Sequence, residues 1–164
     1  MKGDARVIEY LNRGLRHDLT AVNQLWQRSR TLADWGYNDL AKKWYEETAE
    51  KRQHADRFIE RIIFLEGVPN MQELNPLRIG RSMREVLEND LAVESDARDL
   101  CGEAAAYCDS IGDRVSKDLF EELIADEEGH IDFLEAQLTL MEQIGPELYA
   151  QRHTGGLGKD EGHG

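Results

Sequence analysis

The chain has 164 residues, the length of a single domain that can bury a substantial hydrophobic core. Its 33 acidic and 20 basic residues give a formal net charge of -13 at pH 7. The sequence contains no block of Lys and Arg residues, so the composition argues against nucleic acid and anionic membrane as partners. Metal cations are better candidates for a chain of this charge.

The N-terminus runs directly into charged residues and lacks the apolar core of a secretory signal. No uninterrupted apolar run approaches the length of a membrane span. Cys101 and Cys108 are seven residues apart on one expected helix. That spacing corresponds to about 10 Å of rise, whereas a disulfide needs Cα atoms within about 7 Å. We expect two small buried apolar residues and a cytoplasmic protein.

Apolar residues recur at helical spacing along nearly the whole chain, and no useful length alternates with a period of two. The first expected helix spans about 4–35 and ends at Gly36. The second spans about 39–66, with Asn38 as its N-cap and Gly67 as its C-terminal stop.

The second half of the chain predicts two further long helices. One spans about 82–111 and begins with a capping box formed by Ser82 and Glu85. The other spans about 113–144, and a short helix follows at about 146–152.

The connections predict the topology. Short turns join the first two helices and the last two, so each pair is an antiparallel hairpin. Between the hairpins lie 15 residues that include Pro69, Pro76 and Gly80. Fully extended they reach about 50 Å, longer than a 28-residue helix of about 42 Å. We therefore predict an all-α, ferritin-like four-helix bundle with one long crossover and a short fifth helix. The expected domain is 1–152, followed by a disordered Gly-rich tail at 153–164.

Ionisable residues interrupt the apolar stripe near the middle of every long helix. Glu127 and His130 are three residues apart, lie on one helix face, and can hold one metal ion. A carboxylate-metal bundle needs such a Glu-x-x-His pair twice, together with one Glu from each of the other two helices. The remaining interruptions are Asp18, Lys51 with His54 beside it, and Glu94 followed by Arg98.

Each of these residues alone fits a bundle edge, a salt bridge or a hydrogen-bonded core histidine. Buried charges are rare unless they are paired or bind metal, and these residues converge at one level of four helices. The set therefore predicts a metal-derived site. The second Glu-x-x-His pair is incomplete, because the chain has Lys51-Arg52-Gln53-His54 there.

Several segments resemble the bacterioferritin family, over about 1–152. The resemblance rests on these stretches and on the ungapped spacing between them: Met1-Lys2-Gly3-Asp4, Asn23-Gln24, His54-Ala55-Asp56-Arg57, Ile59-Glu60-Arg61, Phe64-Leu65-Glu66-Gly67, Pro69-Asn70 and Asp126-Glu127-Glu128-Gly129-His130-Ile131-Asp132. It implies a hollow 24-subunit shell that oxidises Fe(II) at an intra-subunit di-iron centre and stores ferric mineral. It also implies haem bound between two subunits.

The resemblance places the di-iron ligands of the family on six positions of this chain, namely 18, 51, 54, 94, 127 and 130. Four residues match: His54, Glu94, Glu127 and His130. Asp18 is one methylene shorter than the Glu of the family, and Lys51 stands where a Glu bridges both irons. An ammonium cannot ligate a metal ion, and it repels one at close range.

The next position also departs from the family, because Arg52 replaces the Met that ligates haem iron. A guanidinium stays protonated and has no lone pair for iron. We expect no haem in the pure subunit, and haem b only where a partner subunit supplies the ligand.

Three hypotheses remain open. The first is a bacterioferritin subunit without its own ferroxidase, in which Lys51 forms a salt bridge with Glu94 and Glu127, and which acts with a competent partner subunit or in mineral nucleation. The second is an active ferroxidase with a rearranged site, including one metal held by Glu94, Glu127 and His130. The third is an interaction protein that has left iron storage.

Other residues bear on storage and assembly. Glu46, Glu47, Glu50 and Asp126 face the cavity if the family placement holds, and they then nucleate mineral; the alternative is an ordinary solvated acidic face. Trp26, Trp35 and Tyr45 are expected to be exposed apolar residues that make contacts in a homo- or hetero-oligomeric shell.

Overall fold

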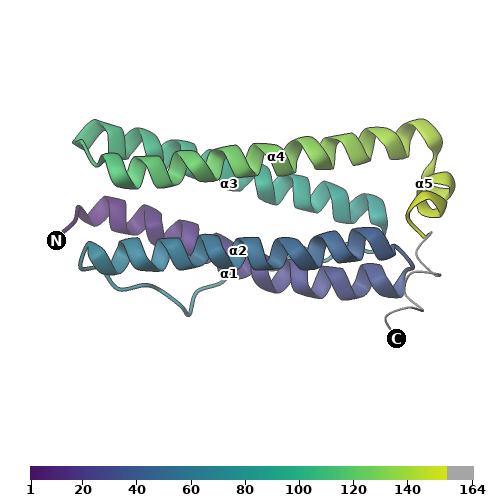
Figure 1. Ribbon diagram of the computed structural model, residues 1–164, viewed down its shortest axis with the longest axis horizontal. Coiled ribbons are helices and arrows are strands. Elements are labelled where there is room, and N and C mark those ends of the chain that lie inside the picture. Colours follow the sequence, from purple (N-terminus) through teal and green to yellow (C-terminus); the bar gives the residue numbers. More distant parts are fainter. Residues whose placement is uncertain (155–164) are drawn as a thin grey trace.

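The computed structural model describes residues 1–154, and α-helices form nearly all the regular structure of that segment (Figure 1). The helices are α1 (Ala5–Asp34), α2 (Asn38–Phe64), α3 (Met83–Ile111), α4 (Arg114–Ile144) and α5 (Pro146–His153). Helices α1 and α2 form one hairpin and α3 and α4 the other, while α5 lies across one end of the bundle (Figure 1). The predicted ferritin-like bundle with a short fifth helix is confirmed.

The crossover between α2 and α3 runs along the bundle (Figure 1). Side chains of α1 fix it by accepting hydrogen bonds from its backbone N–H groups. The pairs are Asn12 with Asn70 (2.8 Å), Thr20 with Asn75 (2.8 Å) and Gln24 with Arg78 (2.7 Å). These bonds satisfy backbone donors of a segment that has no secondary structure of its own.

Two helix ends differ from the sequence expectation. Helix α2 begins at Asn38 itself, because the Tyr37 carbonyl already accepts the Ala41 N–H at 2.8 Å. Asn38 is therefore not the N-cap. At the other end, Glu66 adopts the left-handed conformation with φ of 63°, whereas Gly67 does not. Gly67 serves close packing instead, since a Cβ there would lie 2.7 Å from Cγ2 of Ile8.

The cap of α3 matches the expectation in part. The Ser82 hydroxyl accepts the Glu85 N–H at 3.2 Å, as in a capping box. The Glu85 carboxylate, however, accepts the N–H of Arg81 at 2.7 Å, one residue before the cap. The reciprocal bond of the predicted capping box is thus displaced by one position.

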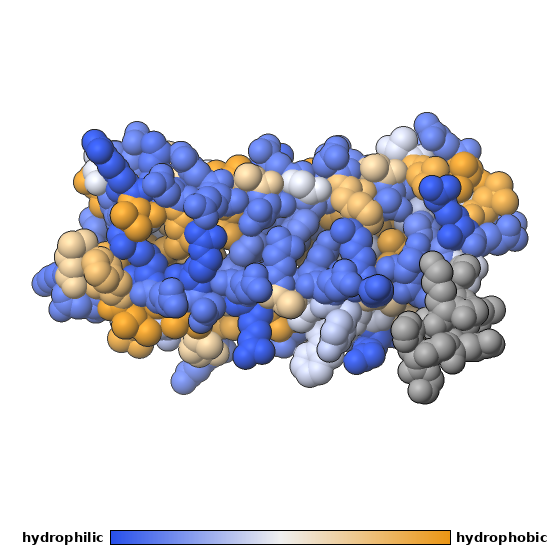
Figure 2. All heavy atoms as spheres, in the orientation of Figure 1, coloured by the Kyte–Doolittle hydropathy of each residue, from blue (hydrophilic) through white to orange (hydrophobic). Residues whose placement is uncertain are grey.

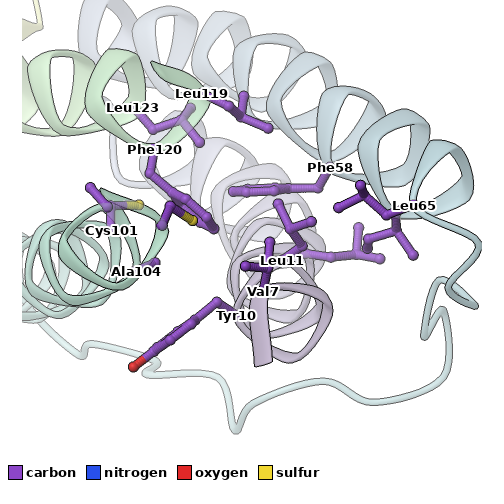
Figure 3. Close-up of a cluster of buried hydrophobic side chains, with 14 of the residues drawn as sticks. Val7, Tyr10, Leu11, Phe58, Leu65, Cys101, Ala104, Leu119, Phe120 and Leu123 are labelled. Atoms are coloured by element: carbon purple, nitrogen blue, oxygen red, sulfur yellow. The ribbon is translucent and has the colours of Figure 1, made fainter. Parts of the chain in front are cut away.

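Two hydrophobic clusters fill the two ends of the bundle. The first surrounds Phe58 and Phe120, whose ring centroids are 5.7 Å apart, and contains both cysteines, which are buried and unpaired as expected (Figure 3). The second surrounds Trp44 and Tyr149. The buried ionisable residues Asp18, Lys51, His54, Glu94 and Glu127 lie between these clusters in sequence, so a polar layer divides the core.

Helix α5 continues through His153, one residue beyond the expected 152, and His153 Nδ1 lies 2.6 Å from the Asp39 carboxylate of α2. The disorder expected for the C-terminal tail concerns residues that, from 155 on, lie outside the described part of the chain. Within residues 1–154, no helix is long and apolar enough to cross a bilayer.

Candidate metal centre

The centre of the polar layer is Lys51, whose side chain is fully buried. Its ammonium donates to Oε2 of Glu94 at 3.0 Å and to Oε1 and Oε2 of Glu127 at 3.0 and 3.1 Å. Glu94 is 5% and Glu127 2% exposed. The salt bridge expected from the sequence is thus present, and it joins α2, α3 and α4 at one point.

The charges of this cluster stabilise one another. Burial alone would lower the pKa of Lys51, but the carboxylates of Glu94 and Asp18 raise it above its usual value. Burial alone would raise the pKa of Glu94, but Lys51 and His130 lower it to about 2. At neutral pH both groups are therefore ionised, and their opposite charges compensate in the core.

Asp18 behaves differently from Glu94. It is 2% exposed, and burial raises its pKa to about 8 against the opposing effect of Lys51. The carboxyl is thus protonated at neutral pH. One possible ligand atom each from Asp18, His54 and Glu127 lies within 4.8 Å of the others, so Asp18 does reach the centre.

The two histidines direct their Nε2 atoms toward acidic residues at the edge of the cluster. Nε2 of His54 lies 3.0 Å from Oδ2 of Asp126, and Nε2 of His130 lies 3.2 Å from Oε2 of Glu50. Burial and Lys51 lower the pKa of His54. Burial also disfavours the charged form of His130, but the hydrogen bond with Glu50 and the carboxylate of Glu94, 3.6 Å from Nδ1, raise its pKa to about 9.

His17 also belongs to the cluster, although its place in the sequence pattern did not predict this. One ring nitrogen of His17 and one carboxylate oxygen each of Glu94 and Glu127 lie within 4.8 Å of one another. Burial and Lys51 lower its pKa to about 4. It also lines a cavity of about 320 Å³ between α1, α3 and the crossover. The available sequence signal was its position beside Asp18, but it falls off the apolar stripe of the helix.

Comparison with known proteins identifies the family. The model of the ferritin-like domain matches residues 8–144. The chain is 56% identical to bacterioferritin of Rhodobacter capsulatus over 150 residues, 92% of this chain and 93% of that protein. It is 58% identical to bacterioferritin of Brucella melitensis over 151 residues, 92% of this chain and 94% of that protein. The chain belongs to the bacterioferritin family.

A solved structure of a family member agrees with the fold. It is that of Rhodobacter capsulatus bacterioferritin, with a metal-free dinuclear site and haem iron in a crystallographic special position. The TM-score is 0.91 at 55% identity, over 93% of this chain and 96% of that chain. The bacterioferritin fold is therefore shared along almost the whole length of both chains.

The residues at the centre of this bacterioferritin-family chain do not fit a pair of metal ions. A dinuclear site needs carboxylate oxygens free to bridge, and here three such oxygens accept hydrogen bonds from the Lys51 ammonium. A divalent ion at the same point would face a fixed positive charge in a low-dielectric surrounding.

The position of Arg52 does not fit an axial haem ligand either. Arg52 is exposed on α2, where it lines a hollow of about 810 Å³ together with Trp26, Tyr45 and Met71. Its guanidinium has five donors and no acceptor. Met71, from the crossover, is the thioether that lines this hollow.

The four acidic residues expected to nucleate mineral differ in their surroundings. Glu46 is exposed, whereas Glu47 lies 3.3 Å from the ammonium of Lys43. Glu50 and Asp126 have half-exposed side chains, 37% and 44%, and contact the two histidines. The face seen in Figure 2 is mainly hydrophilic along its middle, with hydrophobic groups gathered closer to the two ends.

Proposed function

We propose that the chain is an iron-storage shell subunit of bacterioferritin type that lacks a competent di-iron ferroxidase of its own. It acts with a competent partner subunit, or in mineral nucleation and storage. The observation that carries this proposal is the buried Lys51 ammonium, 3.0 Å from both Glu94 and Glu127.

The physical basis is charge replacement. Clustered buried carboxylates repel one another, and in a metal site the cations relieve that repulsion. Here a covalently attached cation does so permanently, so the folded subunit needs no iron to stabilise its centre. Breaking such a buried pair leaves an uncompensated charge and is strongly destabilising.

The same geometry disfavours the alternative of an active ferroxidase with one metal on Glu94, Glu127 and His130. Two of these three ligands are the acceptors of the Lys51 hydrogen bonds. A metal ion could take them only by displacing an ammonium whose side chain is fully buried.

The assembly in this proposal is the 24-subunit shell of the family, homopolymeric or mixed with an intact bacterioferritin. Iron is its cargo, and the α2–α4 acids Glu46, Glu47, Glu50 and Asp126 are the proposed nucleation residues. Haem b enters only where a partner subunit supplies an axial ligand.

Fe(II) oxidation by the purified homogeneous subunit tests the proposal. Anaerobic protein mixed with Fe(II) and then O2 is expected to show no rapid phase above the protein-free rate. Shells co-assembled with an intact bacterioferritin are expected to show one in proportion to the intact subunit. A rapid phase of two Fe(II) per subunit in the homogeneous protein would disprove the proposal.

A further inference from the structure

A cavity of about 320 Å³ lies between α1, α3 and the crossover, beside the polar layer. Its outer part is formed by exposed residues of the crossover and α3, among them Asn75, Arg78 and Asp96. Its inner part is formed by buried residues such as Gln24 of α1 and Glu94 of α3. Sites for small molecules typically have volumes of about 300–1,000 Å³. The cavity is thus large enough for a small organic molecule.

Each carboxylate that lines the cavity already has a cationic partner. Asp90 lies 3.3 Å from the guanidinium of Arg28, and Asp96 lies 3.1 Å from that of Arg78. Glu94 accepts a hydrogen bond from the central ammonium at 3.0 Å. An ion that entered the cavity would therefore lose hydration without finding an unpaired opposite charge. The charges of the lining favour an uncharged molecule.

The neutral polar groups of the lining indicate what such a molecule must carry. Thr20 and Gln24 already bind backbone N–H groups of the crossover through their side-chain oxygens, at 2.8 and 2.7 Å. His17 and the side-chain amide of Asn75 complete the neutral polar lining. Nε2 of His17 is buried, so Nδ1 is the ring nitrogen that can meet a molecule in the cavity. Imidazole and amide groups both donate and accept hydrogen bonds, and they suit a ligand that does the same.

We propose that this cavity is a binding site for a small uncharged molecule of the amide class, held by His17 and Asn75. An amide carries an N–H donor and a carbonyl acceptor, and it has no charge to desolvate. The ion pair of Arg78 and Asp96 lies at the exposed end, and it leaves no free charge there to attract an ion. The site goes beyond the proposed function, since it requires neither a shell nor iron.

Two alkylating reagents of nearly equal size test the site, because they differ mainly in charge. Iodoacetamide is uncharged and iodoacetate is an anion, and each transfers its carbon to an imidazole nitrogen with release of iodide. Peptide mass spectrometry of the treated protein measures the modification of His17 at neutral pH, and N-acetylhistidine in the same solution gives the reference rate. After this correction, iodoacetamide is expected to modify His17 at least about tenfold faster than iodoacetate, since an unpaired charge is costly to bury. Saturating acetamide, which cannot alkylate, is expected to protect His17.

Asp96→Asn tests the ion pair at the exposed end. It leaves the guanidinium of Arg78 without its partner, so iodoacetate is expected to modify His17 faster, by about two- to fivefold, the factor by which an exposed ion pair biases an equilibrium. Asp99→Asn is the matched control, because Asp99 is an exposed acid of the same helix that lies 3.7 Å from Arg98, away from the cavity lining. It is expected to leave both rates unchanged.

Four results would overturn the site: no modification of His17 by iodoacetamide, equal corrected rates with the two reagents, no protection by acetamide, or equal effects of Asp96→Asn and Asp99→Asn. Circular dichroism of both variants verifies that the helices persist. Because the measurement involves neither Fe(II) nor O2 and is made in any oligomeric state, its failure would leave the proposed function untouched.

Discussion

Among single residues, Lys51 has the widest consequences, because one side chain satisfies two buried carboxylates from two other helices. Its ammonium takes the place of metal charge while occupying the oxygens that would bind metal. In the proposed function, the Lys51 ammonium would account both for a centre without iron and for the stability of the metal-free fold.

Lys51→Glu is expected to restore, at least in part, two-metal binding and rapid Fe(II) oxidation. His54, Glu94, Glu127 and His130 are already present, and a bridging carboxylate is the main missing ligand. Asp18, which is one methylene shorter than Glu, limits the recovery. Iron bound per subunit and the rate of the first oxidation phase measure the effect; a variant that binds no more iron than the parent would contradict the argument.

Asp18 makes the stability of the metal-free protein depend on pH. Its pKa is raised from 3.8 unfolded to about 8 in the folded protein, so the folded state holds the proton more tightly. Stability from this group is present below the unfolded pKa and is lost as pH rises toward about 8. The free energy of unfolding of Asp18→Asn is therefore expected to rise relative to that of the parent, by up to about 1.4 kcal/mol per pH unit between pH 3.8 and about 8.

Unfolding of parent and Asp18→Asn at pH 5, 6, 7, 8 and 9, in the absence of metal, checks this expectation. The difference between them should grow with pH and become constant above about pH 8. A difference that is the same at all five values would show that Asp18 does not titrate in this range.

Arg52 predicts that the homogeneous subunit purifies without stoichiometric haem. A guanidinium offers iron no lone pair, whichever way it turns in the hollow that it lines. Absorption spectra with a Soret band at one haem per two subunits would refute this. Arg52→Met is the complementary test, since it supplies a thioether at the same position and is expected to raise the haem content.

At the scale of elements, the close approach of α1 and α2 depends on Gly14. A Cβ at this position would lie 2.5 Å from Cζ of Phe58, inside the first hydrophobic cluster. The aromatic ring fills the space directly against the α1 backbone. The two helices can therefore pack this tightly only with glycine at position 14.

Gly14→Ala is expected to destabilise the protein by about 1–3 kcal/mol, because Phe58 or the helix must shift. Gly102→Ala is the matched control on α3, where nothing lies within 4 Å of the added Cβ. It is expected to stabilise by roughly 0.5–1 kcal/mol, since alanine favours the helix. Thermal unfolding under identical conditions compares them, and shifts of the same sign would argue against a packing role for Gly14.

At the scale of the whole molecule, the polar layer is enclosed between two hydrophobic clusters, away from the outer faces of α1 and α2. Those faces expose Trp26 and Tyr45, as the sequence predicts. Trp35 differs from the expectation: it is partly buried and packs against the second cluster. Changes at the centre can therefore leave the outer surface as it is.

We expect shell assembly to survive the loss of di-iron chemistry. Light scattering and electron microscopy at neutral pH, with the chain alone and after co-expression with an intact bacterioferritin, are expected to show closed shells. Lys51→Glu loaded with Fe(II), which returns a cation to the centre, is the interior control and should assemble equally well. Only monomers or dimers in both experiments would exclude the shell-subunit proposal and favour an interaction protein.

The sequence by itself determined the helices, the crossover and the composition of the polar layer. Helices follow from the sequence because their apolar periodicity involves residues that are close along the chain. The crossover follows because the length of its 15-residue linker can be compared directly with the length of a helix. The convergence of Asp18, Lys51, Glu94 and Glu127 followed from their equivalent places along four apolar stripes. The pairing of Lys51 with both glutamates followed from charge.

Only the tertiary structure decided how the two histidines pair with the acids around them. The sequence could not show that Glu50 faces His130 while Asp126 faces His54, because that pairing depends on the register of α2 against α4. Nor could it show that His17 reaches Glu94, since His17 lies off the stripe and rotation of α1 decides which residues turn inward. Nor could it show that Gly67 is required by its contact with Ile8 of α1, 59 residues away in sequence, while the left-handed backbone falls at Glu66.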